Sequence, residues 1–377
     1  MILPAIIGIA IIAGVLWEAF ETVVLPRRVA RRFRLTVLYY RTTWFIWRAI
    51  SRCTGKPSRR ESFLSFYGPL SLLMLFVLWA ISIILGFGLL YYNSAIKAGL
   101  PASYSTSFYL SGTTMFTLGL GDVVPHTEVQ RILAVTESGL GFGFLALVLS
   151  YLPVIYQAFS RREVSIVLLD ARAGSPPTAA ELLRRHTGAD GARDLEQLLH
   201  EWERAAADML ESHVSYPVVC YFRSQHNNES WLGALVAILD CCALLLAAQT
   251  GPLARQAKLT FAICRHTVVD LTQVMHAAPN TSGNRLPQAE FDRLCAMLSA
   301  ADYRLLDTPE STAKLGKLRE MYEPYVHALA NRLAFQVPPF ILPREVADNW
   351  KTTAWGRITS SSRTATHPDI AQDAHAD

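Results

Sequence analysis

The sequence predicts an all-α membrane protein. A two-span module encloses a short re-entrant helix, an additional N-terminal transmembrane helix precedes this module, and an all-α cytoplasmic bundle follows it. Of the 377 residues, 51% are hydrophobic and 18% are charged, whereas soluble domains carry about 25% charged residues. The longest apolar runs precede residue 160, and behind them apolar positions recur at helical spacing with almost no strand-like alternation. Part of the chain is therefore expected to lie in lipid, and the remainder to fold as helices.

Charge is unevenly distributed along the chain. Residues 1–62 hold 11 Lys and Arg against 3 Asp and Glu, a net of +8, and residues 63–377 hold 24 against 28, a net of −4. A basic front on an otherwise acidic chain argues against a nucleic-acid binder. It is typical of a membrane protein whose cytoplasmic side is marked near the N-terminus.

An apolar run over residues 1–26 forms the first predicted span. It is long enough to cross a bilayer and stops at Pro26, where a cluster of arginines begins. Glu18 and Glu21 lie near its end, where they can reach the interface or pair with those arginines. We favour that structural role over an ion relay.

Residues 27–62 form a basic cytoplasmic or interfacial segment. Within it, aromatic and apolar residues over 35–50 are mixed with Arg41 and Arg48, which predicts an amphipathic helix lying at the lipid headgroups. A further membrane span over 35–50 is the alternative, but it would place Arg41 in the middle of the bilayer.

Two spans are predicted within a module over residues 63–160. The outer helix covers 63–92 and has no charged residue, and the inner helix covers 129–159. The preceding 27–62 segment holds 11 basic residues, and the module itself holds two. The positive-inside rule then places the N-terminus outside and everything after residue 160 in the cytoplasm, which predicts a multi-pass protein of the cell membrane.

The segment between those two spans carries the chemistry. Residues 104–116 suffice for about three turns of helix, and residues 117–122 read Thr-Leu-Gly-Leu-Gly-Asp, which should be extended or irregular. Non-helical backbone at membrane depth is tolerated only inside protein or along a water-filled path. Glycines at alternate positions let successive carbonyl oxygens face one axis, where they can replace the water shell of a monovalent cation. A glycine-rich outer turn of a transporter or anchor is the alternative.

The order span, short helix, T-x-G-x-G-D and span resembles the pore loop and selectivity filter of the potassium-channel superfamily. The motif is similar to the T-I-G-L-G-D filter in the second pore loop of animal two-pore-domain potassium channels. Compared with the T-V-G-Y-G filter, a leucine at the fourth position removes an aromatic hydroxyl that braces the filter, and Tyr109 and Leu110 stand where paired tryptophans often occur. The resemblance implies that Asp122 anchors the outer mouth and that K⁺ is coordinated by the filter residues Thr117, Leu118, Gly119, Leu120 and Gly121.

Two features of the inner span are candidates for gating. Gly141 lies between Gly139 and Gly143, and the resemblance implies a hinge at Gly141, whereas close helix packing by small residues is an equally weighted alternative. Pro153 removes a helical hydrogen bond and is expected to kink the cytoplasmic end of the span, as the proline kink of voltage-gated potassium channels does.

Glu137 is a third candidate, because a carboxyl group within a span is costly unless it is paired or wet. We expect it to face the back of the filter, near Asp122 or the Thr113 and Thr114 pair, and to tune filter stability and pH sensitivity. The alternative is a protonated, inert side chain. A Glu137→Gln variant with unchanged conductance, selectivity and pH response would refute the tuning role.

Residues 161–358 are predicted to form an all-α cytoplasmic domain, and residues 359–377 a disordered polar tail. The apolar run over 231–248 is assigned to a buried bundle helix and not to a fourth span, because Asp240 would lie near the bilayer centre. No catalytic constellation, metal pair or phosphate-binding loop appears, so we expect no enzyme and no cofactor. Helices are expected over 178–186, 192–212, 229–248, 252–277, 287–305 and 310–335.

These observations predict a passive potassium channel. One chain supplies one loop, so a complete pore requires a homotetramer around a common axis, with K⁺ and the lipid bilayer as its partners. The sequence does not identify a ligand for the cytoplasmic domain. Two alternatives stay open: a weakly selective monovalent cation channel, because Leu120 loosens the filter, and a non-conducting membrane-anchored sensor whose helical domain signals.

Overall fold

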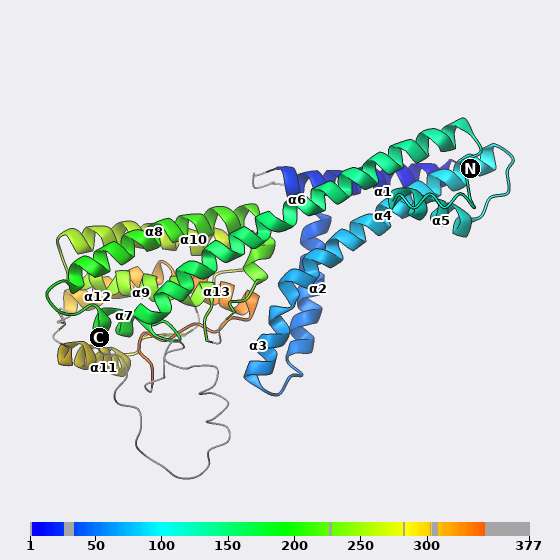
Figure 1. The fold of residues 1–377 in the computed structure, drawn as a ribbon. Helices are drawn as coiled ribbons and strands as arrows, with labels where there is room; N and C mark the ends of the chain where they lie inside the picture. The colour runs from blue at the N-terminus through cyan, green and yellow to red at the C-terminus, as the bar shows by residue number, and fades with distance from the viewer. Residues whose placement is uncertain are drawn as a thin grey trace, which may run out of the picture.

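The computed structural model describes residues 2–25, 34–225, 228–281, 283–301, 303 and 308–343. All regular secondary structure in these residues is helical, as the predicted fold class requires. Figure 1 shows an elongated molecule with an arm of apolar helices at one end and a helical bundle at the other. The long helix α6 (Glu128–Ala173) runs through both. The predicted tail over 359–377 lies outside the described residues.

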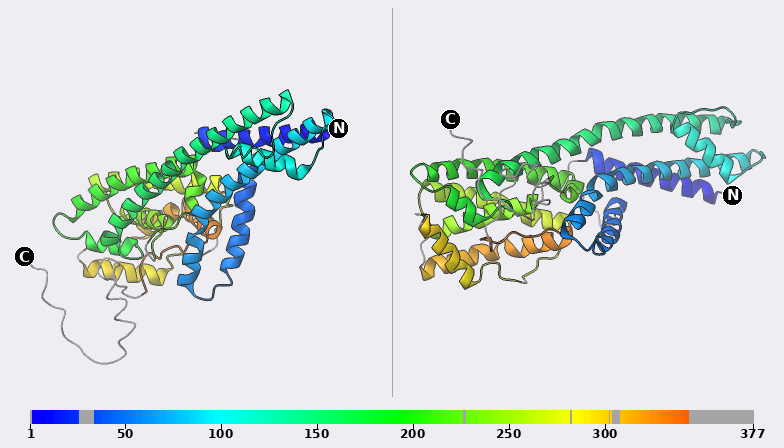
Figure 2. Two further views of the ribbon diagram at one scale, coloured as in Figure 1. Left: turned by 45° about the vertical axis from the view of Figure 1, so that its right-hand side comes forward. Right: turned by 60° about the horizontal axis from the view of Figure 1, so that its bottom comes forward.

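The arm is built on close contact between α1 (Leu3–Ala19) and α4 (Tyr67–Lys97), which lie side by side in both views of Figure 2. A Cβ atom on Gly8 would lie 2.6 Å from the carbonyl oxygen of Gly86. Small residues at such crossings let two backbones approach where no hydrophobic driving force operates, as inside a bilayer. The N-terminal helix is therefore packed directly onto the module.

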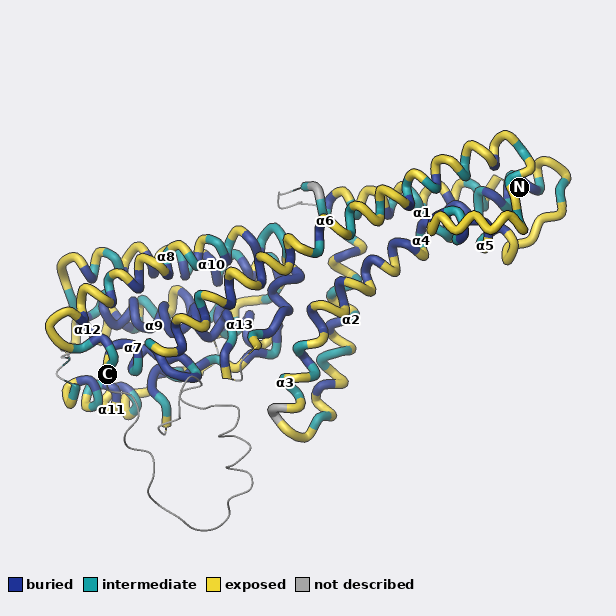
Figure 3. The backbone as a smooth tube through the Cα atoms, in the orientation of Figure 1, coloured by how far each residue is buried: buried dark blue, intermediate teal, exposed yellow. Residues whose placement is uncertain are grey.

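Among the described residues, four helical segments are long and apolar enough to cross a membrane: Leu3–Val23, Arg59–Lys97, Glu128–Ala173 and Trp231–Ala248. The first three belong to the arm or run into it, and Figure 3 shows many exposed positions along α1 and α6. The fourth is α9 (Trp231–Ala248), which lies inside the bundle and is buried along almost its whole length. The structure thus gives α9 protein neighbours on all sides.

The buried carboxylate of α9 is fully partnered. Arg285 Nη2 lies 2.6 Å from Asp240 Oδ2, and the Tyr322 hydroxyl donates to Asp240 Oδ1 at 2.5 Å. Burial raises the pKa of Tyr322 well above its ordinary value, so this hydroxyl keeps its proton and remains a donor. A charge so partnered is tolerated in a protein core.

Around α9, the bundle contains α7 (Ala179–Arg185), α8 (Gly191–Ser215), the 3₁₀ helix η2 (Pro217–Tyr221), α10 (Pro252–Val274), α11 (Gln288–Ala300), α12 (Pro309–Glu320) and α13 (Glu323–Leu333). The single helix predicted over 310–335 is wrong, because the chain breaks between α12 and α13. Pro324 occupies the first turn of α13, where a missing N–H costs nothing, whereas in a continuous helix it would clash with the preceding turn.

The predicted end of the inner helix at residue 159 is also wrong. Arg161 and Arg162 resemble the basic flank of a span, but α6 passes through them and through Pro153 to Ala173. Arg162 is buried, binds Glu163 at 2.9 Å, and donates to the carbonyl oxygens of Val219 and Phe222 at 3.1 and 3.0 Å. These partners come from the chain that folds back onto α6, so the sequence flank alone does not reveal them.

The outer helix differs from its predicted bounds of 63–92. A short helix, α3 (Pro57–Ser65), ends just before α4 begins at Tyr67, and α4 continues to Lys97. Its last turn ends next to Gly99, whose φ of +69° suits a helix terminus.

The predicted amphipathic helix over 35–50 is α2 (Leu35–Ser51). Trp44 of this helix packs against protein: it is 1% exposed, and its ring lies 4.8 Å from that of Tyr67 and 5.0 Å from that of Tyr221, whereas Leu38, Phe45 and Ile46 are exposed. The indole nitrogen of Trp44 donates to the carbonyl oxygen of Arg332 in the bundle at 2.8 Å. Helix α2 therefore joins the arm to the bundle.

The two acidic residues at the end of the first span have structural partners. Glu18 accepts hydrogen bonds from the backbone amides of Leu35 and Thr36, at 3.0 and 3.2 Å, and so caps the first turn of α2. Glu21 accepts from the Trp17 indole nitrogen at 2.7 Å and lies 3.6 Å from Arg34 Nε. This is the structural role that the sequence favours over an ion relay.

Candidate functional site

The re-entrant segment contains a short helix, α5 (Tyr104–Met115), wedged between α4 and α6. A Cβ atom on Gly88 of α4 would lie 2.2 Å from Phe108, and one on Gly141 of α6 would lie 2.1 Å from the carbonyl oxygen of Met115. Both glycines therefore permit backbone contacts that any side chain would prevent. The position of α5, and of the loop that follows it, depends on these two contacts.

The backbone after α5 has a positive φ at every second residue. Thr117, Gly119 and Gly121 have φ values of +57°, +54° and +82°, and they alternate with Leu118 and Leu120. This alternation is the geometry that lets successive carbonyl oxygens face one side of the loop. A left-handed conformation at a threonine costs about 1–3 kcal/mol and persists only where the surroundings hold it.

The start of the loop is tied to the last turn of α5. The Thr117 amide donates to the Thr114 carbonyl oxygen at 3.0 Å, and the Leu118 amide donates to the Thr113 carbonyl oxygen at 2.8 Å. Because the amides at the start of the loop are bonded back into α5, its direction follows that of the helix end.

In a single chain the loop is open to solvent. Every residue over 116–122 is exposed, and Leu118 and Leu120 are 61% and 66% exposed. Apolar side chains at these fractions, on a loop with alternating backbone handedness, indicate a surface that other molecules complete.

Asp122 is held from behind by the short helix. The Tyr109 hydroxyl of α5 donates to Asp122 Oδ2 at 2.8 Å. The sequence contained a signal for this bond, because Tyr109 occupies a position where an aromatic side chain is common. That its hydroxyl would bind Asp122 was not predicted. An aromatic hydroxyl therefore braces this loop although position 120 is a leucine.

We expect Tyr109→Phe to loosen the loop, because the variant keeps the ring and removes only the hydrogen bond to a charged acceptor. Hydrogen exchange of the amides over 117–124 should become several-fold faster. Tyr104→Phe is the matched control, since the Tyr104 ring stacks on that of Tyr92 at 3.9 Å and its hydroxyl makes no hydrogen bond to the loop within the described residues. Equal exchange in both variants would mean that the Tyr109 hydroxyl does not hold the loop.

Glu137 lies behind α5 and not beside Asp122. It is fully buried, and its carboxyl group is hydrogen-bonded to the Ser111 hydroxyl, which also lies 2.9 Å from the carbonyl oxygen of Ile84. The three residues belong to α6, α5 and α4 and link these helices. The bond from Ser111 to Glu137 was not predicted from the sequence, because the segment contains several serines and nothing in the sequence distinguishes Ser111 from the others.

The two remaining gating candidates, Gly141 and Pro153, differ in where they lie relative to the loop. Gly141 contacts the end of α5, as described above, whereas nothing in the described chain lies within 4 Å of a Cβ built on Gly139 or Gly143. Pro153 lies inside the continuous α6, towards the bundle. The structure therefore joins Gly141 and Glu137 to the re-entrant helix and separates Pro153 from it.

A span, a wedged short helix, a loop of alternating handedness and a second span together define a pore-loop module. Residues 74–157 match the model of a family described as an ion channel. For that part of the chain, the match confirms the resemblance to a pore-loop channel deduced from the motif.

The chain is also similar to a curated protein, the uncharacterized membrane protein YdjJ of Bacillus subtilis (strain 168), with 25% identity over 201 residues. The match covers 52% of this chain and 57% of that protein, so the chain spans little more than half the length of this relative. No solved structure matches the chain. The comparisons identify a membrane protein with an ion-channel module.

Proposed function

We propose that the protein is a potassium-selective channel whose pore is formed by four copies of the chain. The observation that carries the proposal is the loop over 117–121, with positive φ at alternate residues and with its amides bonded back to α5. Carbonyl oxygens supplied by four such loops would replace the hydration shell of K⁺ without a fixed charge that traps the ion. Conduction is passive and requires no cofactor.

The faces left exposed in one chain support this assembly. Several apolar side chains along one side of α6 are exposed in the single chain. In an oligomeric pore, neighbouring copies of the chain would cover them. These side chains are Ile132, Val135, Phe142, Leu145 and Leu149. In the proposed tetramer these residues pack between copies or line the inner cavity.

The proposed orientation puts the N-terminus outside and the bundle in the cytoplasm, as the distribution of basic residues favours. Asp122 then lies at the outer mouth, where a carboxylate attracts cations. A weakly selective cation channel is the alternative that Leu120 favours, because its side chain is exposed and makes no hydrogen bond of the kind that braces a tyrosine.

Flux from purified protein in liposomes tests the proposal. We expect K⁺ efflux from liposomes that contain the protein, and we expect Gly119→Asp to reduce it to the level of protein-free liposomes, because a side chain at this position disrupts the carbonyl geometry. Gly99→Asp is the matched control: Gly99 also has positive φ, +69°, and lies in the same inter-span segment but outside the filter. Absence of K⁺ flux at any pH or voltage would favour a non-conducting sensor.

A further inference from the structure

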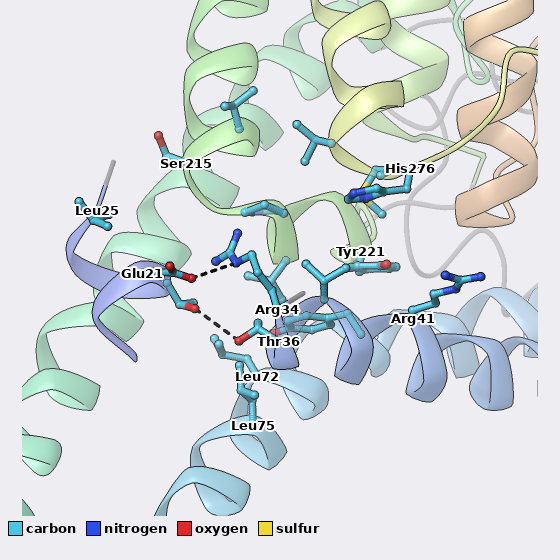
Figure 4. Close-up of a pocket in the computed structure, with 18 of the residues that line it drawn as sticks. Glu21, Leu25, Arg34, Thr36, Arg41, Leu72, Leu75, Ser215, Tyr221 and His276 are labelled. Atoms are coloured by element: carbon cyan, nitrogen blue, oxygen red, sulfur yellow. Dashed lines mark hydrogen bonds and ion pairs between the residues drawn. The ribbon is translucent and has the colours of Figure 1, made fainter. Parts of the chain in front are cut away.

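A cavity lies where the membrane arm meets the bundle (Figure 4). Its volume is about 310 Å³, which is within the usual range for small-molecule sites. The arm contributes residues of η1 (Phe20–Val24), α2, α4 and α6, and the bundle contributes residues of α8, η2, α10 and α13. No residue of the proposed filter lines it.

One side of the cavity is basic. Arg34, Arg41 and Arg332 line it together with His276, and among the described lining residues Glu21 is the only carboxylate. Arg34 lies 3.6 Å from Glu21, whereas Arg41 and Arg332 have no carboxylate within 4 Å in the described part of the chain. Three guanidinium groups thus face one acid, which favours an anion between them.

The basic side also contains polar atoms without partners. Arg332 Nε is buried and makes no hydrogen bond within the described residues, and the same holds for the Tyr40 hydroxyl. Burying a polar atom without a partner costs about 1–3 kcal/mol, and native proteins rarely leave such atoms unused. Both residues line the cavity, and a small movement of their side chains would bring these atoms to a ligand with acceptor oxygens.

The opposite side is apolar. Leu72, Leu75, Phe76 and Trp79 of α4 form a continuous wall, and Tyr151 of α6 closes it. These α4 residues occupy the part of the span nearest the bundle, and Figure 4 shows Leu72 and Leu75 below Arg34, with His276 of the bundle above. A free inorganic anion would use the arginines but not this wall.

We propose that this cavity binds an anionic phospholipid from the membrane leaflet on the bundle side. The phosphate lies among the arginines, and the beginning of an acyl chain runs along the α4 wall. Basic pockets between transmembrane helices recognise lipid headgroups in this way. A cavity of about 310 Å³ holds a headgroup and the upper part of one chain, and the remainder of the lipid stays in the bilayer.

The bound lipid would connect three parts of the molecule. Its headgroup contacts α2 and α13, and its chain contacts Tyr151, two residues before Pro153 on α6. Occupancy would therefore hold the inner helix against the bundle. This consequence for the pore rests on the proposed function, whereas binding itself does not depend on it.

Binding is tested on the full-length protein in a neutral detergent, by native mass spectrometry with three probes: dioctanoyl phosphatidylglycerol, dioctanoyl phosphatidylcholine and inorganic phosphate. We expect the phosphatidylglycerol to bind more tightly than either of the others. The double variant Arg41→Gln, Arg332→Gln should bind it about 30-fold more weakly, since each basic residue near an anionic lipid contributes about fivefold.

Arg193→Gln combined with Arg293→Gln is the matched control, because both arginines are at least 46% exposed and lie outside the cavity. It should bind phosphatidylglycerol like the unmodified protein. If the cavity double variant does not fold, the exposed Arg41→Gln alone should still weaken binding about fivefold. Equal binding of the two lipids, binding of phosphate as tight as that of phosphatidylglycerol, or an equal loss in the control variant would each overturn the proposal.

Discussion

Replacing Asp240 by alanine is expected to destabilise the bundle by about 3–5 kcal/mol, the usual cost of removing one partner of a buried ion pair. Asp240 is fully buried, and its two oxygens accept from Arg285 at 3.0 and 2.6 Å. The variant would leave the Arg285 guanidinium in the core without its main counter-charge. It would also leave the buried Tyr322 hydroxyl without the carboxylate that accepts its hydrogen bond.

Thermal unfolding of the purified protein, followed by near-ultraviolet circular dichroism, measures this effect. Asp208→Ala is the matched control, because Asp208 pairs with Arg161 where both side chains are substantially exposed, and such pairs contribute about 0–1 kcal/mol. The double variant Asp240→Leu, Arg285→Met should recover much of the loss, since an apolar pair needs no counter-charge. If Asp240→Ala is no more destabilising than Asp208→Ala, the buried pair does not hold the bundle together.

Gly141→Ala is expected to displace α5 and to abolish most of the K⁺ flux. The added Cβ would lie 2.1 Å from the Met115 carbonyl oxygen, so the two helices must separate by about 1 Å to reach ordinary contact distance. Overpacking of this kind costs about 1–3 kcal/mol, and here it acts on the helix that carries the loop.

Gly143→Ala separates packing from hinge bending. It raises helix propensity by the same amount as Gly141→Ala, about 1 kcal/mol, but nothing in the described chain lies within 4 Å of its Cβ. A packing role predicts that only Gly141→Ala lowers the thermal stability and the flux. Equal effects of the two variants would instead favour a flexible hinge in this part of α6.

The loop could be predicted because its signal is local. The residue order Thr-Leu-Gly-Leu-Gly-Asp places glycine at two of the three positions that have positive φ, and flexibility at alternate positions is a property of the residues themselves. The helical bundle was likewise predictable from periodicity, although Pro324 was a local signal of the break between α12 and α13 that the predicted bounds missed.

Contacts between distant segments could not be predicted in the same way. Periodicity places Glu137 on one face of its helix, but it does not say that Ser111 lies opposite. Arg162 follows an apolar run as the flank of a span would, and only the folded chain brings the Val219 and Phe222 carbonyl oxygens to it. The cavity at the junction is lined by residues of eight helical elements, so no single stretch of sequence predicts it.

The proposed function requires that the loop over 117–121 conduct K⁺ in preference to Na⁺. The reversal potential of reconstituted protein, measured with K⁺ on one side of the bilayer and Na⁺ on the other, tests it most directly. We expect a reversal potential that follows the K⁺ gradient when either K⁺ concentration is changed. A reversal potential near zero in equal concentrations of K⁺ and Na⁺ would contradict it.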